Sequence, residues 1–184
     1  MFTPQEKREL LAIAREAISN VVEATPFRRR PPWQGGLAQP CGAFVTLRIG
    51  GDLRGCIGYI ESTEPLADVV ASVAVKAALD DPRFPPLTAA EFRRVSVEVS
   101  VLSPLRPVSD ITTIEIGVHG LLLELGHHRG LLLPQVATEY GWARLEFLAN
   151  LARKAGLPKD AWSDPEAKLY AFTADIIEEE QPVT

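Results

Sequence analysis

Residues 51–60 read GDLRGCIGYI, a strand-like run interrupted by glycines, and the predicted architecture is built around it. Its large apolar residues are typical of a β-strand, whereas Gly55 and Gly58 weaken a strand and leave room beside it. A second strand-like run, AFVTLRI, occupies residues 43–49 and is separated from the first by Gly50-Gly51. A Gly-Gly pair between two such runs favours a tight β-hairpin, so we predict antiparallel pairing here.

The hairpin also predicts which residues face one another across the two strands. With the turn between the runs, Val45 is expected opposite Cys56 and Leu47 opposite Arg54. Cys41 then lies about 13 Å along the strand from the residue opposite Cys56. Since the Cα atoms of a disulfide lie within about 7 Å of each other, we predict two free thiols.

Alternate residues of a strand share a face, which places Arg54, Cys56 and Gly58 on one side of the hairpin. A guanidinium beside a thiol stabilises the thiolate and lowers its pKa, so Cys56 and Arg54 are candidate catalytic residues. The missing side chain at Gly58 leaves space for a ligand beside the sulfur. A cysteine that only packs, and an arginine that pairs with a carboxylate, are the structural alternatives. No histidine can be placed beside the thiol, so the pattern favours a ligand-binding role for Arg54 over a catalytic thiol.

The rest of the chain mixes helices with further antiparallel strands. Helices are predicted over 4–24 with a Thr3–Glu6 capping box, over 64–79 after Ser62-Thr63, for one turn from a Thr88–Glu91 capping box, and over 134–156 with a break at Gly141. Strands are predicted at 95–102, in a hairpin of 121–125 with 131–133 that turns through 126–130, and at 168–177 before an acidic tail at 178–180. Hairpins outnumber βαβ units, which indicates an α+β class, a mostly antiparallel sheet with helices packed on it.

Two further places carry candidate side chains. Glu98 lies on the polar face of an alternating strand, where it either faces solvent or serves as ion-pair partner to Arg54 or as a general base; the pattern favours the structural role. In DDPRFPPL, residues 80–87, Asp81 and Arg83 either pair locally at a rigid corner or present Arg83 to a ligand, and both remain open.

Composition excludes several function classes. The 184 residues carry a net charge of −5 and a pI near 5.3, which argues against a general affinity for nucleic acid. The N-terminus lacks the apolar core of a signal peptide, and no apolar run approaches the ~20 residues that span a bilayer, so we expect no membrane association and a cytoplasmic location. The adjacent His127 and His128 diverge in a turn, and no metal, phosphate or dinucleotide motif is present, so no metal and no cofactor is predicted.

Several long motifs, in order, resemble the AMMECR domain family over nearly the whole chain. They are GAFVTLRIGGDLRGCIG, DDPRFPPLTAAEF, VEVSVLSP, HGLLLELGHHRGLLLPQVA and KAGLP, and LRGCIG at 53–58 matches the signature hexapeptide of the family in full. The resemblance implies one AMMECR-type domain over 1–184, built as an α+β fold of two interleaved subdomains of unequal size. It also implies that the signature region lies beside a groove, for which the candidate ligand-binding residues are Leu53, Gly55, Ile57, Gly58, Arg83 and Glu98.

The resemblance also implies partners. Microbial members of the family are associated with a Memo-like protein and a radical S-adenosylmethionine enzyme, in the AmmeMemoRadiSam system. We therefore expect a ligand- or partner-binding module. The alternative is a small-molecule or modification enzyme that uses a Cys56 thiolate activated by Arg54.

Overall fold

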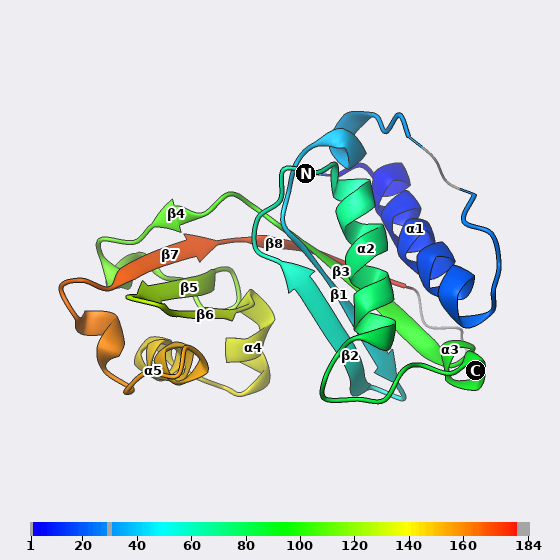
Figure 1. The fold of residues 1–184 in the computed structure, drawn as a ribbon. Coiled ribbons are helices and arrows are strands. Elements are labelled where there is room, and N and C mark those ends of the chain that lie inside the picture. The colour runs from blue at the N-terminus through cyan, green and yellow to red at the C-terminus, as the bar shows by residue number, and fades with distance from the viewer. Residues whose placement is uncertain (1, 29–30, 180–184) are drawn as a thin grey trace. The chain divides into compact units, whose positions relative to one another are not determined.

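The computed structural model describes residues 2–28 and 31–179, and the chain divides into two compact units. The first unit comprises residues 1–102 and 175–184, and the second comprises residues 103–174. Because the second unit is inserted into the first, the two are interleaved along the sequence. Both units combine helices with antiparallel strand pairs, so the predicted α+β class is confirmed (Figure 1).

The first unit is a four-stranded sheet with two long helices on one face. Its strand order is β2-β1-β3-β8, and Figure 1 shows α1 and α2 side by side against the sheet. The elements are α1 (Pro4–Val22), β1 (Ala43–Ile49), β2 (Asp52–Tyr59), α2 (Leu66–Leu79), α3 (Ala89–Phe92), β3 (Val95–Leu102) and β8 (Ala174–Glu178), with a 3₁₀ turn at Gly35–Ala38. The capping boxes at Thr3 and Thr88 are both formed, as predicted.

Strand alternation explains how this unit buries its core. In β1, Val45 and Leu47 are fully buried and pack with the apolar faces of α1 and α2. In β3, Val97 and Val99 lie directly opposite these two residues and join the same core. Thr46, between Val45 and Leu47, therefore points to the other face of the sheet.

The hairpin of β1 and β2 forms as predicted, but its register differs. Val45 lies opposite Ile57 rather than Cys56, and Leu47 lies opposite Gly55 rather than Arg54. A β-bulge between Leu47 and Arg48 leaves Arg54 without a partner in the ladder. The simple alternation that placed Arg54 and Cys56 on one face therefore does not hold through this segment.

The second unit has its own sheet and its own hydrophobic core. The strand order is β4-β7-β5-β6, and α5 packs on this sheet. The elements are β4 (Arg106–Pro107), β5 (Gly120–Leu125), β6 (His128–Leu132), α4 (Pro134–Glu139), α5 (Arg144–Lys154) and β7 (Lys168–Phe172), with 3₁₀ turns at Ile111–Thr113 and Ala161–Ser163. The hairpin turn is shorter than predicted: Leu125 pairs with His128, which leaves only Gly126 and His127 in the turn.

Two other boundaries correct the predictions. The helix expected from residue 64 begins at Leu66, because the Ser62 hydroxyl accepts the Glu64 N–H in a turn before the helix instead of capping it. The single strand expected over 168–177 is two strands, β7 and β8, that belong to different sheets. The predicted break at Gly141 is present, with a φ of 65°. Glu180, in the predicted acidic tail, lies outside the described residues.

Candidate functional site

The backbone of Cys56 is held by an ion pair from the proline-rich segment that follows α2, residues 80–87. The Cys56 N–H donates to Asp81 Oδ2 over 2.8 Å, and Arg83 Nη2 donates to the Cys56 carbonyl over 3.3 Å. Asp81 and Arg83 are themselves joined by an ion pair of 2.7 Å. Within residues 2–28 and 31–179, β2 has a neighbouring strand on one side only, so the two side chains satisfy Cys56 backbone groups that no described strand reaches. Asp81 and Arg83 therefore pair locally, which the sequence had left as one of two alternatives.

The proline-rich segment itself fixes this ion pair. The Arg83 backbone N–H donates to Asp81 Oδ1 over 3.1 Å, an aspartate-initiated turn around Pro82. Asp81 is only 3% exposed, whereas the Arg83 side chain is 51% exposed. One member of the pair is thus anchored inside the unit, and the other reaches the surface.

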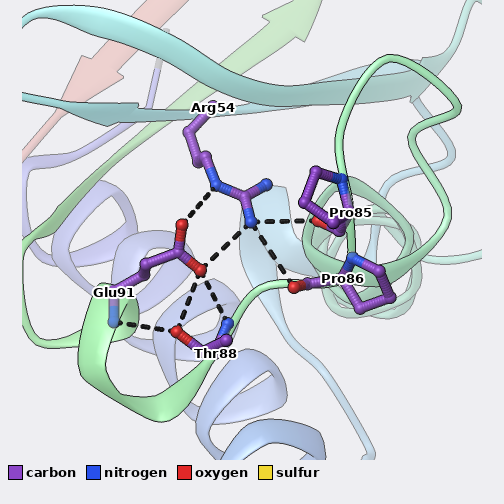
Figure 2. Close-up of polar contacts among 5 residues, drawn as sticks. All are labelled: Arg54, Pro85, Pro86, Thr88 and Glu91. Atoms are coloured by element: carbon purple, nitrogen blue, oxygen red, sulfur yellow. Dashed lines mark hydrogen bonds and ion pairs between the residues drawn. The ribbon is translucent and has the colours of Figure 1, made fainter.

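Arg54 is buried in a separate polar cluster, shown in Figure 2. Its Nε and Nη2 atoms donate to the two carboxylate oxygens of Glu91 at 3.0 and 3.1 Å. Nη2 also donates to the carbonyls of Pro85 and Pro86, at 2.9 and 3.4 Å. Glu91 in turn accepts hydrogen bonds from Thr88 in the capping box of α3. The carboxylate that pairs with Arg54 is therefore Glu91, not Glu98 as the sequence analysis had considered.

Cys56 and Glu98 share a row across three strands, with Thr46 between them. Thr46 lies opposite Cys56 on β2 and opposite Glu98 on β3, and directly opposed residues share a face of the sheet. The Thr46 hydroxyl donates to Cys56 Sγ over 3.4 Å, and the Ser100 hydroxyl donates to Glu98 Oε1 over 3.2 Å. This row faces away from α1 and α2, and each of its three side chains can form hydrogen bonds.

The surroundings of the Cys56 thiol keep it protonated. Burial raises the pKa of Cys56 above its ordinary value, and the Glu98 and Asp81 carboxylates act in the same direction. The Thr46 hydrogen bond and the Arg83 guanidinium oppose this rise without reversing it. Arg83, not Arg54, is thus the cation that acts on this thiol.

The neighbouring carboxylates are shifted the other way. Hydrogen bonds from Arg83 hold the pKa of Asp81 well below its usual range. Hydrogen bonds from Arg54 lower the pKa of Glu91 to about 2. Both ion pairs are consequently fully charged at neutral pH.

The glycines of the motif admit neighbours rather than a ligand. A Cβ at Gly55 would lie 2.2 Å from the Ala77 carbonyl oxygen of α2, and a Cβ at Gly58 would lie 2.3 Å from the Phe44 ring. The space expected beside the sulfur at Gly58 is therefore filled by that ring. Of the other groove candidates, Leu53 is 37% exposed, whereas Ile57 is partly buried against the core.

The structure also brings in residues that sequence reasoning did not assign to the site. Thr46 was absent from the candidates because the predicted register placed a different residue opposite Cys56. Glu91 was recognised only as part of a capping box, since its second role depends on how the segment after α2 folds back to β2. The hydrogen bond from the Cys56 N–H to Asp81 joins residues 25 positions apart, so no local sequence pattern predicts it.

A metal-binding cluster and a membrane-spanning helix are both absent from the described residues. Within residues 2–28 and 31–179, no group of three or more His, Cys, Asp or Glu side chains is arranged to hold a metal ion. Both cysteines are free, as predicted. None of the helices in the same part of the chain has the length and apolar character needed to cross a bilayer.

Comparison with known proteins identifies the family of the chain. A model of the AMMECR1 family matches residues 11–177. The chain belongs to the AMMECR1 family. Its AMMECR1 relatives include a protein of Methanothermobacter thermautotrophicus, 47% identical over 182 residues with 95% of each chain covered. Another is protein MK0488 of Methanopyrus kandleri, 42% identical over 191 residues, with 98% of this chain and 92% of that protein covered.

A solved structure supports the AMMECR1 fold. The crystal structure of protein PH0010 from Pyrococcus horikoshii superposes with a TM-score of 0.87 at 41% identity, covering 94% of this chain and 91% of that one. The AMMECR1 match over residues 11–177 spans both compact units. The resemblance stated from the sequence motifs is thereby confirmed.

Proposed function

We propose that this AMMECR1-family protein is a ligand- or partner-binding module that acts with a Memo-like protein and a radical S-adenosylmethionine enzyme, as protein A of the AmmeMemoRadiSam system. Its contact surface is the LRGCIG segment of β2 together with the segment that follows α2. Within that surface, Leu53 and Arg83 make the contacts to the partner or ligand. The location in the cytoplasm stays a prediction.

The observation that carries this proposal is the ion pair bound to the edge of β2. Asp81 and Arg83 fix the proline-rich segment to Cys56, so two distant parts of the sequence form one rigid surface. Arginine at a rigid, partly exposed site is among the residues that dominate binding energy at interfaces. The exposed sides of Leu53 and Arg83 lie on these two joined segments.

The same geometry gives less support to the enzyme alternative. A catalytic thiolate needs a lowered pKa, whereas the pKa of Cys56 is raised. Arg54, proposed as the activating cation, already donates to a carboxylate and two carbonyls. Its bonds are those of a residue that joins β2 to α3.

The proposal is tested by reconstituting the complex with the Memo-like protein and the radical enzyme and measuring the dissociation constant. We expect Arg83→Gln to weaken binding by about tenfold or more, as for an arginine at an interface hot spot. Leu53→Ala should weaken binding by about tenfold, because it removes apolar area that the interface buries. Cys56→Ser should leave binding unchanged. Lys159→Gln, an exposed cation in the second unit, is the control.

Thermal unfolding must first show that each variant folds, because Arg83 also pairs with Asp81. If neither Leu53→Ala nor Arg83→Gln changes the affinity, this surface does not bind the partners. If Cys56→Ser abolishes a chemical activity of the reconstituted system while binding persists, the enzyme alternative replaces the proposal.

A further inference from the structure

A basic cleft lies in the first unit, apart from the surface proposed above. Its volume is about 1040 Å³, and its lining comes from α1, the turn between β1 and β2, the start of β3 and the end of β8. Five cationic side chains and two carboxylates line it: Lys7, Arg8, Arg15, Arg93, Arg94, Glu178 and Glu179. In a chain of net charge −5, this is a local concentration of positive charge that favours an anionic ligand.

Helix α1 already binds two carboxylates beside this cleft, Asp175 on β8 and Glu179 directly after it. Lys7 Nζ lies 2.6 Å from Asp175 Oδ1, and Arg15 donates from Nε and Nη2 to both carboxylate oxygens of Glu179 at 2.5 Å. Eight residues of helix span about 12 Å and four residues of strand span about 13 Å, so the two spacings match. The cleft is therefore shaped to pair cations with carboxylates carried on an extended chain.

Other cations of the cleft are not used in this way. Arg8 and Arg94 are exposed, and neither forms an ion pair within the described part of the chain. The Arg93 side chain is 77% exposed and reaches only a 4.0 Å contact with Glu23. Arg8 precedes Arg15 by two helical turns, so both lie on one face of α1. These three guanidinium groups can bind further carboxylates.

The strand that lines the cleft is at the edge of its sheet. Within residues 2–28 and 31–179, the strand order is β2-β1-β3-β8. Strand β8 therefore has a neighbouring strand, β3, on one side only. Ile176, Ile177 and the two glutamates that follow line the cleft, and Ile176 is 37% exposed. An edge strand with backbone groups directed outward can pair with an added extended segment.

We propose that this cleft binds an extended, carboxylate-rich segment of a partner protein. The segment adds to the outer edge of β8 through backbone hydrogen bonds, and its carboxylates pair with Arg8, Arg93 and Arg94. The guanidinium fork matches a carboxylate bidentately, as Arg15 and Glu179 already show. Glu178 and Glu179 disfavour a compact, highly charged anion, whereas an extended segment places its charges away from them.

The test uses the full chain and the peptide EIEIEIEI-amide, labelled with fluorescein on its N-terminal amine, in fluorescence anisotropy titrations. We expect saturable binding that weakens as salt increases, because the contacts are charged. Arg8→Gln with Arg94→Gln should weaken binding at least tenfold. Lys154→Gln with Lys159→Gln, the same change of charge at exposed sites of the second unit, should leave it unchanged. Equal affinity of both double variants contradicts the proposal.

Two further peptides separate charge from strand addition. A QIQIQIQI peptide should bind at least tenfold more weakly, and a peptide N-methylated at alternate residues, which loses donors to β8, should do the same. If the N-methylated peptide binds as tightly as the parent, no strand is added and the proposal fails. Displacement by polyphosphate together with unchanged N-methyl binding identifies a general polyanion site instead. These outcomes leave the LRGCIG surface untouched, since neither Arg8 nor Arg94 belongs to it.

Discussion

At the scale of single residues, the surroundings of the Cys56 thiol act on its pKa in opposite directions. Burial and two carboxylates raise its pKa, while Thr46 and Arg83 lower it. Only the thiolate reacts with iodoacetamide, so the rate of alkylation reports the thiolate fraction. In a Cys41→Ser background, we expect slow labelling at pH 7 and a rate that rises about tenfold per pH unit toward pH 9.

Substitutions separate the two arginines in that experiment. Arg83→Gln removes a cation that lowers the pKa of Cys56, so labelling at pH 8 should become slower. Arg54→Lys should leave the pH profile of labelling unchanged. A Cys56 pKa below 7 in the native protein, or a strong dependence on Arg54, contradicts this account and restores the activated thiolate.

Arg54 stabilises the folded protein, because its hydrogen bonds to Glu91 join β2 to α3. Arg54→Ala removes the cation that pairs with Glu91 and the guanidinium donor to two carbonyls, and we expect the free energy of unfolding to fall by about 2–3 kcal/mol. Arg54→Lys keeps the charge but not the planar fork, and should lose less. Urea denaturation at pH 7 measures both, and an Arg54→Ala variant as stable as the parent would show that the cluster contributes nothing.

The same pair gives a pH dependence. The pKa of Glu91 is lowered from 4.5 to about 2 in the folded state, so its stabilisation is complete above pH 4.5 and is lost as the pH falls toward 2. Between pH 5 and pH 2, Arg54→Ala should therefore lose less stability than the parent chain. Parallel curves for the two proteins would assign the acid sensitivity to other carboxylates.

At the scale of elements, β2 depends on a close approach to α2. The Ala77 carbonyl oxygen lies where a side chain at Gly55 would begin, so Gly55→Ala must push the strand from the helix. We expect a loss of about 2–3 kcal/mol in the free energy of unfolding, the range for overpacking a core. Gly50→Asn is the control: Gly50 has a φ of 61°, which asparagine tolerates, and open space around it. Equal losses for both would mean that the contact with α2 is not the cause.

Elements with local signals could be predicted from the sequence. The Gly50-Gly51 turn, the capping boxes at Thr3 and Thr88, and the break at Gly141 each depend on residues a few positions apart. The bulge at Arg54 could not be predicted, because it accompanies bonds to Glu91 and the Pro85 carbonyl. These partners lie more than 30 residues away in sequence.

In the candidate site too, the local segments could be predicted from the sequence, whereas the contacts between distant residues could not. The LRGCIG and DDPRFPPL segments were both recognised, and the structure joins them through Asp81, Arg83 and Cys56. The pairing of individual side chains was not recoverable, since a one-residue change of register exchanges the faces of a strand. Likewise, residues 168–177 alternate as one strand, yet the chain passes from one sheet to the other near Thr173, a change set by long-range pairing.

At the scale of the whole molecule, the described residues form two separate hydrophobic cores. Leu10 on α1 is fully buried in the core of the first unit, and Leu148 on α5 is fully buried in that of the second. A unit with its own core can unfold locally while the other unit stays folded, because each core holds its own helices and strands together. The two leucines therefore form a matched pair of probes.

Truncation of either leucine to alanine should cost about 3 kcal/mol within its own unit. We expect Leu148→Ala to speed amide hydrogen exchange across residues 103–174 more than in the first unit, and Leu10→Ala to do the converse. Both effects are measured by hydrogen–deuterium exchange under native conditions, followed by mass spectrometry of peptic fragments. If each variant speeds exchange equally in both units, the chain opens only as a whole. The insertion of one unit within the other would then couple the two cores.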